Sequence, residues 1–470
     1  MKNFNIRKGN YLKSPIGTSN MMYTILIVLT PFIIFGTFKN GIYPAIKGYG
    51  NLYTVFKPLI YILIPAVTCL ITEYLYYLIK KDKKNIFEIF GDSYAIIPGV
   101  FLGLITSINT PIWLLILGAT IASLSKLLFG GFGKNKLNPA LVGALFVTVI
   151  FSSYLGGYLN PYEIDTISSA TPLANMTASS YVATYDNIVK PYGTLWTFFF
   201  GNIPGAIGET SSLLCIVALI YLTYKKTIKW RIPLSYILSV AIISFIICIT
   251  KDIGFWFILF NLLSGGLLFG ATFMATDPVT SPISHNGQVI GGIFLGIITM
   301  IIRYLTPLPE GVLISILIFN IITIVINKLS ITLYNKKTLK ITLLITTCIL
   351  CVLSSFIISK NIVNKELDDT YKIISKEKVG VNTVYEVTGR GYAGNSSIKL
   401  KITFTGNNVS NIEVIRSHET YIGMIYDEDY LNKIINNQNN LDNLDTISGC
   451  TYTSKYLKEI VEKTKEDYNK

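Results

Sequence analysis

Residues 55–79 read VFKPLIYILIPAVTCLITEYLYYLI, and Lys57 and Glu73 are the only charged side chains among them. A membrane helix needs roughly 20 consecutive apolar residues, so this run predicts a membrane-spanning helix. The basic segment that follows, Lys80 to Lys84, is typical of the cytoplasmic end of such a helix. The stretch therefore indicates a protein that lies in a bilayer.

The whole chain has the same character. Of its 470 residues 51% are hydrophobic and 14% charged, against about 25% charged in soluble domains. We predict a polytopic α-helical membrane protein with about ten spans in residues 1–335, an anchoring helix in 336–360 and a small α+β domain in 361–470. The apolar runs lie near 21–37, 55–79, 94–108, 111–128, 139–153, 210–224, 232–250, 254–271, 288–304, 311–327 and 341–359. Several runs are short or interrupted by Gly and Pro, as at Pro98-Gly99. Broken membrane helices line buried sites, and they occur in proteins built from two inverted structural repeats, an architecture that is possible here.

The chain has a net charge of +13, and the positions of its basic residues indicate how it is oriented in the membrane. Basic residues gather at the N-terminus, at 80–84, at 225–231 and at 328–340, each time where an even number of spans separates them. Because Lys and Arg concentrate in cytoplasmic loops, we expect a cytoplasmic N-terminus, an outer loop at 154–208 and an extracytoplasmic C-terminal domain in the cell membrane. Nucleic acid is excluded as a partner, because no soluble segment gathers these charges, and membrane lipid is expected.

Metal binding is not expected. The six cysteines and two histidines have no spacing that suits zinc or an iron–sulfur cluster. The C-terminal region instead alternates apolar and polar residues over 384–416, with turn signals at Gly389-Arg390-Gly391 and Gly406-Asn407-Asn408. This pattern predicts antiparallel strands, and a helix is expected from Lys455 to about Asp467.

Two segments share the pattern D-T-I-S, two small residues and Thr. They are Asp165 to Thr171 (DTISSAT) and Asp445 to Thr451 (DTISGCT), and both are expected on the outer side. A single copy would be read as an Asx turn or a helix N-cap. Two copies in unlike domains on one side of the membrane favour a shared function.

This pattern resembles D-x-x-[ST]-G-A-[TS], the site at which bacterial flavin transferases attach FMN through a phosphoester to the last threonine. The resemblance implies two covalent FMN groups, on Thr171 and Thr451, and a flavin transferase as a maturation partner. Ser169 and Cys450 replace the usual Gly and Ala, and both are small. The other residues that it implies at the two sites are Asp165 and Asp445 for transferase recognition, with Ser168, Ser448 and Gly449 beside the threonines.

The two halves of the chain each resemble a known component of one enzyme complex. Residues 1–335 resemble the D subunit of the Rnf ion-translocating oxidoreductase, a relative of the Nqr B subunit, on GGFGKNKLNPA (130–140), SSATPL (168–173), GETS (208–211), ATDPVT (275–280) and PEGV (309–312). Residues 341–470 resemble the G subunit, an anchored FMN-binding domain, on GYAG (391–394), HET (418–420) and SGCT (448–451). His418 and Glu419 are therefore candidates for flavin contact, although Tyr421-Ile422-Gly423 follows them where the family has Pro-Gly.

Acidic residues in or beside the spans are candidates for an ion pathway, because an acid inside a membrane is costly to keep. They are Glu73, Glu209, Asp277 and Glu310. For Glu73 the alternative is a partnered interior acid. The Gly-rich turn at 130–140 permits two interpretations, tight helix packing or a second pocket for phosphate, riboflavin or another flavin.

Together these observations predict a membrane subunit that carries electrons through covalent FMN in an Rnf-type ferredoxin:NAD⁺ oxidoreductase coupled to Na⁺ or H⁺. The other Rnf-type subunits are the implied partners, since this chain has no Rossmann or iron–sulfur motif. Two alternatives stay open. One is a flavin relay to quinone or to extracellular acceptors without ion pumping, and the other is a small-solute transporter or channel.

Overall fold

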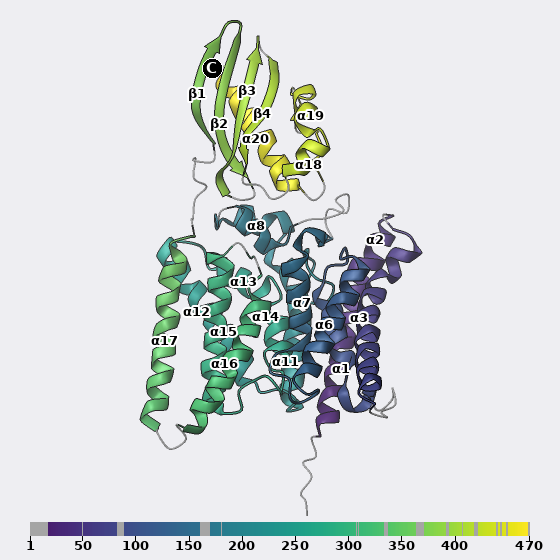
Figure 1. Cartoon of the computed structure of the whole chain (residues 1–470). Coiled ribbons are helices and arrows are strands. Elements are labelled where there is room, and N and C mark those ends of the chain that lie inside the picture. Colours follow the sequence, from purple (N-terminus) through teal and green to yellow (C-terminus); the bar gives the residue numbers. More distant parts are fainter. Residues whose placement is uncertain are drawn as a thin grey trace, which may run out of the picture.

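The chain forms a helical bundle with a small sheet domain at one end (Figure 1). The computed structural model describes residues 17–468 except 49, 82–88, 160–169, 180, 307, 309, 333–336, 363–370, 392–393, 407, 418–421, 439, 442–443 and 448–449. Within that part, six helices are long and apolar enough to cross a membrane, and a bent pair makes a seventh. The predicted class, a polytopic helical membrane protein with an α+β domain, is confirmed.

Each of the eleven apolar runs contains a helix. The long ones are α1 (Thr18–Thr37), α3 (Leu52–Ile79), α12 (Arg231–Lys251), α15 (His285–Leu305), α16 (Val312–Thr332) and α17 (Lys337–Ser359). The shorter ones are α5 (Ile96–Ile105), α6 (Ile112–Leu128), α7 (Pro139–Ile150) and α11 (Ser212–Tyr224), and the bent pair is α13 (Trp256–Leu263) with α14 (Leu267–Phe269) and η5 (Gly270–Met274).

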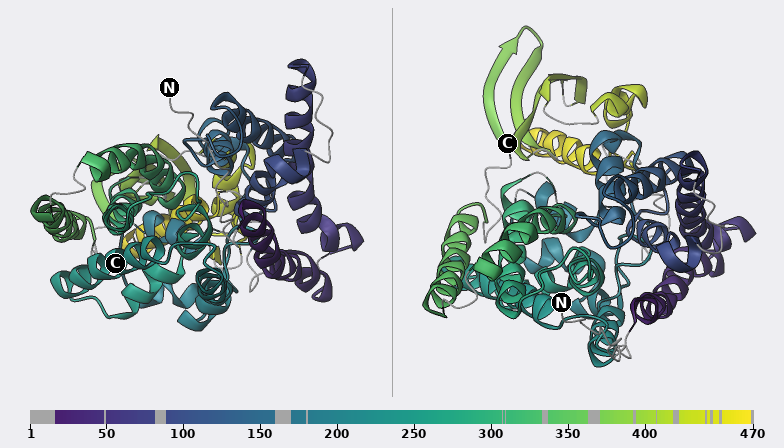
Figure 2. Two further views of the ribbon diagram at one scale, coloured as in Figure 1. Left: turned by 90° about the horizontal axis from the view of Figure 1, so that it is seen from below. Right: turned by 60° about the horizontal axis from the view of Figure 1, so that its bottom comes forward.

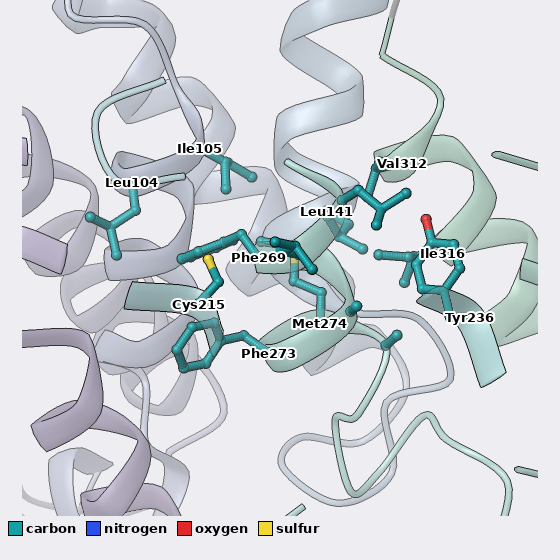
Figure 3. Close-up of a cluster of buried hydrophobic side chains, with 14 of the residues drawn as sticks. Leu104, Ile105, Leu141, Cys215, Tyr236, Phe269, Phe273, Met274, Val312 and Ile316 are labelled. Atoms are coloured by element: carbon teal, nitrogen blue, oxygen red, sulfur yellow. The ribbon is translucent and has the colours of Figure 1, made fainter. Parts of the chain in front are cut away.

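Small connecting elements complete the bundle. They are η1 (Phe38–Ile42), α2 (Tyr43–Ile46), η2 (Ile89–Ser93), η3 (Ser152–Tyr154), α8 (Pro172–Ala178), α9 (Tyr185–Ile188), η4 (Lys190–Tyr192) and α10 (Leu195–Phe200). Viewed from below, the helices up to α7 and those from α12 onward lie on opposite sides of the bundle (Figure 2). Between them lies an apolar core that includes Phe269 and Phe273 (Figure 3).

Glycines set the closest helix contacts. Gly99 and Gly103 of α5 lie directly against the backbone of α3, and Gly292 and Gly296 of α15 lie against Ser235 and Ser239 of α12. Small residues four apart let membrane helices approach closely, and an added Cβ would clash at each of these positions. The expected interruption at Pro98-Gly99 is therefore wrong. Pro98 lies in the first turn of α5, where proline is tolerated, and Gly99 is a packing position.

The helix break lies instead in the run at 254–271. The axes of α13 and the following helix differ by 59°, with Gly265 and Gly266 between them. Gly265 has φ +53°, a left-handed conformation that favours glycine. The carbonyls of Asn261, Ser264 and Gly265, freed at the end of α13, accept hydrogen bonds from the buried guanidinium of Arg303 at 2.8, 3.1 and 3.1 Å. A cation thus closes the negative end of the half-helix.

The C-terminal domain is a four-stranded antiparallel sheet in the order β1-β2-β3-β4, packed on helix α20 (Thr451–Tyr468). The strands are β1 (Tyr371–Val379), β2 (Asn382–Gly391), β3 (Gly394–Thr405) and β4 (Asn408–Ser417), and two short helices follow, α18 (Ile422–Asp427) and α19 (Tyr430–Asn436). The predicted antiparallel strands are thus confirmed. Gly389-Arg390-Gly391 does not form a turn but ends β2, where Ile460 of α20 occupies the space that a side chain on Gly389 would need.

Candidate functional site

The first candidate threonine, Thr171, begins helix α8. Its backbone is extended, and its hydroxyl oxygen accepts a hydrogen bond from the amide of Ala174 at 3.2 Å. Pro172 follows at the first helical position, which suits its fixed φ and missing N–H. Thr171 is therefore an N-cap, and its side chain is buried, with 4% of the residue exposed.

Helix α8 lies directly over the break between α13 and α14. A methyl group of Leu173 lies so close to Gly265 that a Cβ there would clash. The hydroxyl of Tyr192 donates to the carbonyl of Ala170 at 3.0 Å, and the side-chain amide of Asn175 donates to the carbonyl of Asn187 at 2.8 Å. These contacts fix the residues on both sides of Thr171 against the membrane body.

The second candidate, Thr451, is the first residue of α20 and is half-buried. Its hydroxyl lies 3.5 Å from the carbonyl of Ile447. Ser454 stabilises the same turn, because its hydroxyl donates to the carbonyl of Cys450 at 2.7 Å and accepts from the amide of Ile447 at 3.3 Å. The helix was expected to begin at Lys455; it begins four residues earlier, so that Thr451 lies at the positive end of an 18-residue helix, where phosphate is favoured.

Cys450, which replaces the usual alanine, packs in the core of the sheet domain and is 4% exposed. Asp445, at the start of the same motif, is exposed. Beside this segment the hydroxyl of Tyr430 is buried and has no hydrogen-bond partner among the described atoms. Burial, with a smaller contribution from Asp445 and Cys450, raises the pKa of Tyr430 to about 12.

The other predicted site residues lie outside the described part of the chain. They are Asp165, Ser168, His418, Glu419, Ser448 and Gly449. Their proposed roles stay predictions.

The sheet domain contacts the membrane body through Arg390. This side chain, 7% exposed, donates from Nη2 to the carbonyl of Ala178 at the end of α8, at 3.0 Å. Its guanidinium also lies over the ring of Tyr456 in α20, 5.1 Å from the ring centre. One residue therefore joins the helix that Thr171 caps to the helix that Thr451 begins, and both helices lie where the domain meets the bundle (Figure 1).

Glu73 is a partnered acid. Its carboxylate forms an ion pair with Lys126 at 2.6 Å, with 0% and 3% of the two side chains exposed. The hydroxyl of Ser93 donates to the same carboxylate, and Lys126 donates to the carbonyl and hydroxyl of Ser93 at 2.6 and 2.9 Å. Buried charges need such partners.

Asp277 and Glu209 have different surroundings. Asp277 accepts from the amide of Val279 at 3.1 Å and from the hydroxyl of Thr280 at 3.3 Å, which makes an Asx-type turn. Glu209 lies at the helix break, where its carboxylate occupies the space beside Gly266. Glu73, Asp277 and Glu209 therefore lie in three separate places, and the fourth predicted acid, Glu310, is an electrostatic neighbour of Glu209.

A pocket lies at the Gly-rich turn before α7. Gly130, Gly131 and Gly133 have positive φ, and Asn138 caps α7 by accepting from the amide of Ala140 at 3.1 Å. The lining of the pocket combines apolar side chains of α1 and α5 with the polar residues Lys126, Asn135, Asn138 and Asp277. The pocket agrees with the second interpretation of this turn, and a ligand there stays a prediction. Tight helix packing, the first interpretation, is not seen at Gly133, where nothing lies within 4 Å of an added Cβ, or at Gly131, where the nearest atom is the hydroxyl oxygen of Tyr77 at 3.7 Å.

Sequence reasoning missed the cations. Lys126 and Arg303 lie inside apolar runs, and an intramembrane charge of either sign is a signal that could have found them. Lys39, which follows the first apolar run, is also buried, and it donates to the carbonyl of Ile203 at 2.5 Å and to the hydroxyl of Thr210 at 2.9 Å. No signal in the sequence distinguishes Arg390 from the other basic residues of its domain.

A membrane bundle that carries a small antiparallel sheet domain at one end defines a polytopic membrane protein with an attached α+β domain. The chain belongs to the NQR2, RnfD, RnfE family, whose model matches residues 5–333. Residues 391–466 match an FMN-binding domain. The predicted fusion of a D-type membrane body with an FMN-binding domain is thereby confirmed.

Individual relatives of the chain are D subunits of ion-translocating oxidoreductase complexes. The chain is 31% identical over 328 residues to the D subunit of the proton-translocating ferredoxin:NAD(+) oxidoreductase complex of Clostridium ljungdahlii, and the match covers 69% of this chain and 94% of that protein. It is 31% identical over 330 residues to the D subunit of the Na(+)-translocating complex of Acetobacterium woodii, covering 69% and 93%. The D subunit of an ion-translocating oxidoreductase complex from Salmonella typhi is 26% identical over 351 residues, covering 68% and 94%.

Proposed function

We propose that this chain is a membrane subunit of an ion-translocating ferredoxin:NAD⁺ oxidoreductase and carries electrons through two FMN groups, esterified to Thr171 and Thr451. The observation that carries the proposal is the contact of Arg390 with Ala178, because it brings the segments of both threonines to one end of the bundle. The names of the relatives support the complex, and the matched FMN-binding domain supports the cofactor.

The residues around Thr451 fit a phosphoester. The hydroxyl is half-buried at the start of a long helix, so a phosphate there would meet the positive end of the helix dipole. Asp445 is exposed and available to a transferase. Bound FMN would supply one- and two-electron transfer.

The residues around Thr171 fit a phosphoester at a fixed point above the membrane body. Esterification keeps the hydroxyl oxygen, and the hydrogen bonds of Ala170 and Asn175 hold the flanking backbone in place. Leu173 of α8 lies directly against Gly265 at the helix break. This packing offers a physical link between a redox group at Thr171 and the part of the membrane body where Glu209 lies.

The test is flavin attachment to the whole chain, coexpressed with a flavin transferase. Denatured protein should retain two fluorescent flavins, and Thr171→Ala and Thr451→Ala should each remove one. Thr177→Ala, in the same helix as Thr171, and Thr446→Ala, in the same motif as Thr451, are matched controls that should retain both. A chain without covalent flavin in every variant would contradict the proposal and favour a transporter.

Ion coupling needs the complete complex. Vesicles that contain it should couple ferredoxin:NAD⁺ electron transfer to uptake of Na⁺ or H⁺, and the Thr171→Ala variant should lose both together. Electron transfer that continues at the full rate without ion movement would favour a relay to another acceptor. The proposed orientation, with both threonines outside the cell, is tested by labelling single cysteines from the outer face.

A further inference from the structure

We propose that Arg390 is a positioning residue that docks the FMN-binding domain on α8 and so sets the arrangement of the two flavin carriers. This inference rests on the proposed function for its electron-transfer part, whereas docking itself is a property of the protein alone. In the transfer step one flavin is oxidised and the other reduced, and no further reactant enters.

The geometry of Arg390 supports a docking role. A guanidinium has five N–H donors in one plane and stacks on aromatic rings, so a single arginine can join a carbonyl and a ring. Arg390 does this between two parts of the molecule, with Ala178 as acceptor at 3.0 Å and the Tyr456 ring 5.1 Å from its guanidinium carbon. The carbonyl of Ala178 is at the negative end of α8, where a cation is favoured.

Burial increases the importance of this contact. Arg390 is 7% exposed, and its Nε has no partner among the described atoms. Taking an arginine out of water is costly, so a buried guanidinium is tolerated where neighbouring groups interact with it. The hydrogen bond of Arg390 to Ala178 links the domain to the membrane body, whereas Tyr456, in the same domain as Arg390, holds the guanidinium in place for that contact.

The same strand orients Thr451 toward the membrane body. Gly389 contacts Ile460 and Arg390 contacts Tyr456, so β2 approaches the start of α20 as it ends. The beginning of α20, with Thr451, therefore lies toward the bundle, on the side where α8 is found (Figure 1). Loss of the Arg390 contact would remove the hydrogen bond that holds this end of the domain against α8.

Docking is measured first, without flavin. Spin labels on cysteines at Lys190 of η4 and Asn411 of β4, both exposed, report the distance between body and domain in the full chain, with the exposed Cys348 replaced by serine. The labelled protein with Arg390 intact should give one narrow distance distribution. The Thr171→Ala/Thr451→Ala chain, which carries no flavin, should give the same result. Arg390→Ala should broaden the distribution. Tyr456→Leu, which keeps the apolar volume and removes the aromatic face, should broaden it too.

Electron transfer is measured next, in flavinylated protein. Arg390→Ala should retain both fluorescent flavins but slow single-turnover electron transfer between them at least tenfold. Arg390→Lys, which keeps the charge and one donor, should recover part of the rate. Arg416→Ala, an exposed arginine of β4, is the matched control and should match wild type.

A narrow distance distribution in Arg390→Ala would overturn the docking role. A broad distribution with an unchanged transfer rate would overturn the positioning role. Absence of covalent flavin would instead contradict the proposed function, and the spin-label distances would still decide whether Arg390 docks the domain.

Discussion

At the scale of single residues, the ion pair of Glu73 and Lys126 shows how a membrane protein keeps a charge in its interior. Both side chains are buried, and Ser93 binds both of them. A buried pair is not by itself strongly stabilising, because desolvation offsets most of the attraction, but removal of one partner leaves the other charge uncompensated. The two roles predicted for Glu73, partnered acid and ion ligand, therefore lead to different results on substitution.

We predict that Glu73→Gln destabilises the protein by about 3–5 kcal/mol because Lys126 is left buried without a counter-charge. The double variant Glu73→Gln/Lys126→Met should recover most of that loss. Thermal unfolding in detergent measures both. Ion uptake in vesicles then separates the roles, since a structural pair predicts recovered uptake in the double variant, and an ion ligand predicts that uptake stays lost.

Tyr430 gives a prediction for alkaline pH. Its pKa is raised from 10.0 to about 12, so the folded state binds the phenol proton more tightly than the unfolded state does. The resulting stability is fully present below pH 10 and is lost as the pH rises toward 12. Tyr430→Phe should weaken this alkaline loss, and it should not destabilise the domain at pH 7, since the hydroxyl has no described partner. Melting temperatures of the full wild-type and Tyr430→Phe chains between pH 7 and pH 11.5 check both expectations. Parallel pH profiles for the two chains would contradict the weaker alkaline loss expected for Tyr430→Phe.

At the scale of elements, the break at Gly265 and Gly266 is the feature that joins the candidate site to the membrane body. Arg303 binds the end of the first half-helix, Glu209 lies beside the start of the second, and Leu173 lies against Gly265. The backbone conformation and the neighbouring side chain both exclude a Cβ at Gly265.

We predict that Gly265→Ala is more destabilising than Gly48→Ala. Both glycines have positive φ, +53° and +86°, so each substitution carries a backbone cost of about 1–2 kcal/mol. Nothing lies within 4 Å of a Cβ at position 48, whereas Leu173 must move for one at position 265. Thermal unfolding compares the two, and Gly265→Ala should also change the fluorescence of flavin on Thr171. Equal melting temperatures would show that Leu173 does not hold α8 on the break.

Much of the arrangement of elements could be predicted from hydropathy. All eleven apolar runs contain helices, and in the described part of the chain six of these helices, with the bent pair as a seventh, are long enough for a full apolar span. The break could not be placed in the same way. Pro98-Gly99 and Gly265-Gly266 are both dipeptides that disfavour helix, and only tertiary packing decides that Gly99 meets α3 while Gly265 meets Leu173. Thr171 and Thr451 could be selected by their shared motif, but not Arg390, because its partner is a backbone carbonyl 212 residues away.

At the scale of the whole molecule, the chain combines in one polypeptide a membrane body and an FMN-binding domain. Covalent connection through α17 keeps the domain at a high effective concentration beside the body, so even a small interface can be occupied. Asn361 adds to this connection, because its side chain donates to the carbonyl of Tyr304 at 3.1 Å just after α17 ends.

The same arrangement predicts an order of flavin attachment. Thr171 is 4% exposed and held by packing on both sides, whereas Thr451 is half-buried and Asp445 beside it is exposed. A transferase must reach the hydroxyl, so the folded chain with limiting transferase should acquire flavin on Thr451 before Thr171. Mass spectrometry of the two peptides over time measures the order. The Arg390→Ala variant, in which the domain is released, should shorten the delay at Thr171 if docking contributes to it. Simultaneous attachment in both proteins would show that attachment precedes folding, because only an unfolded chain presents the two threonines equally.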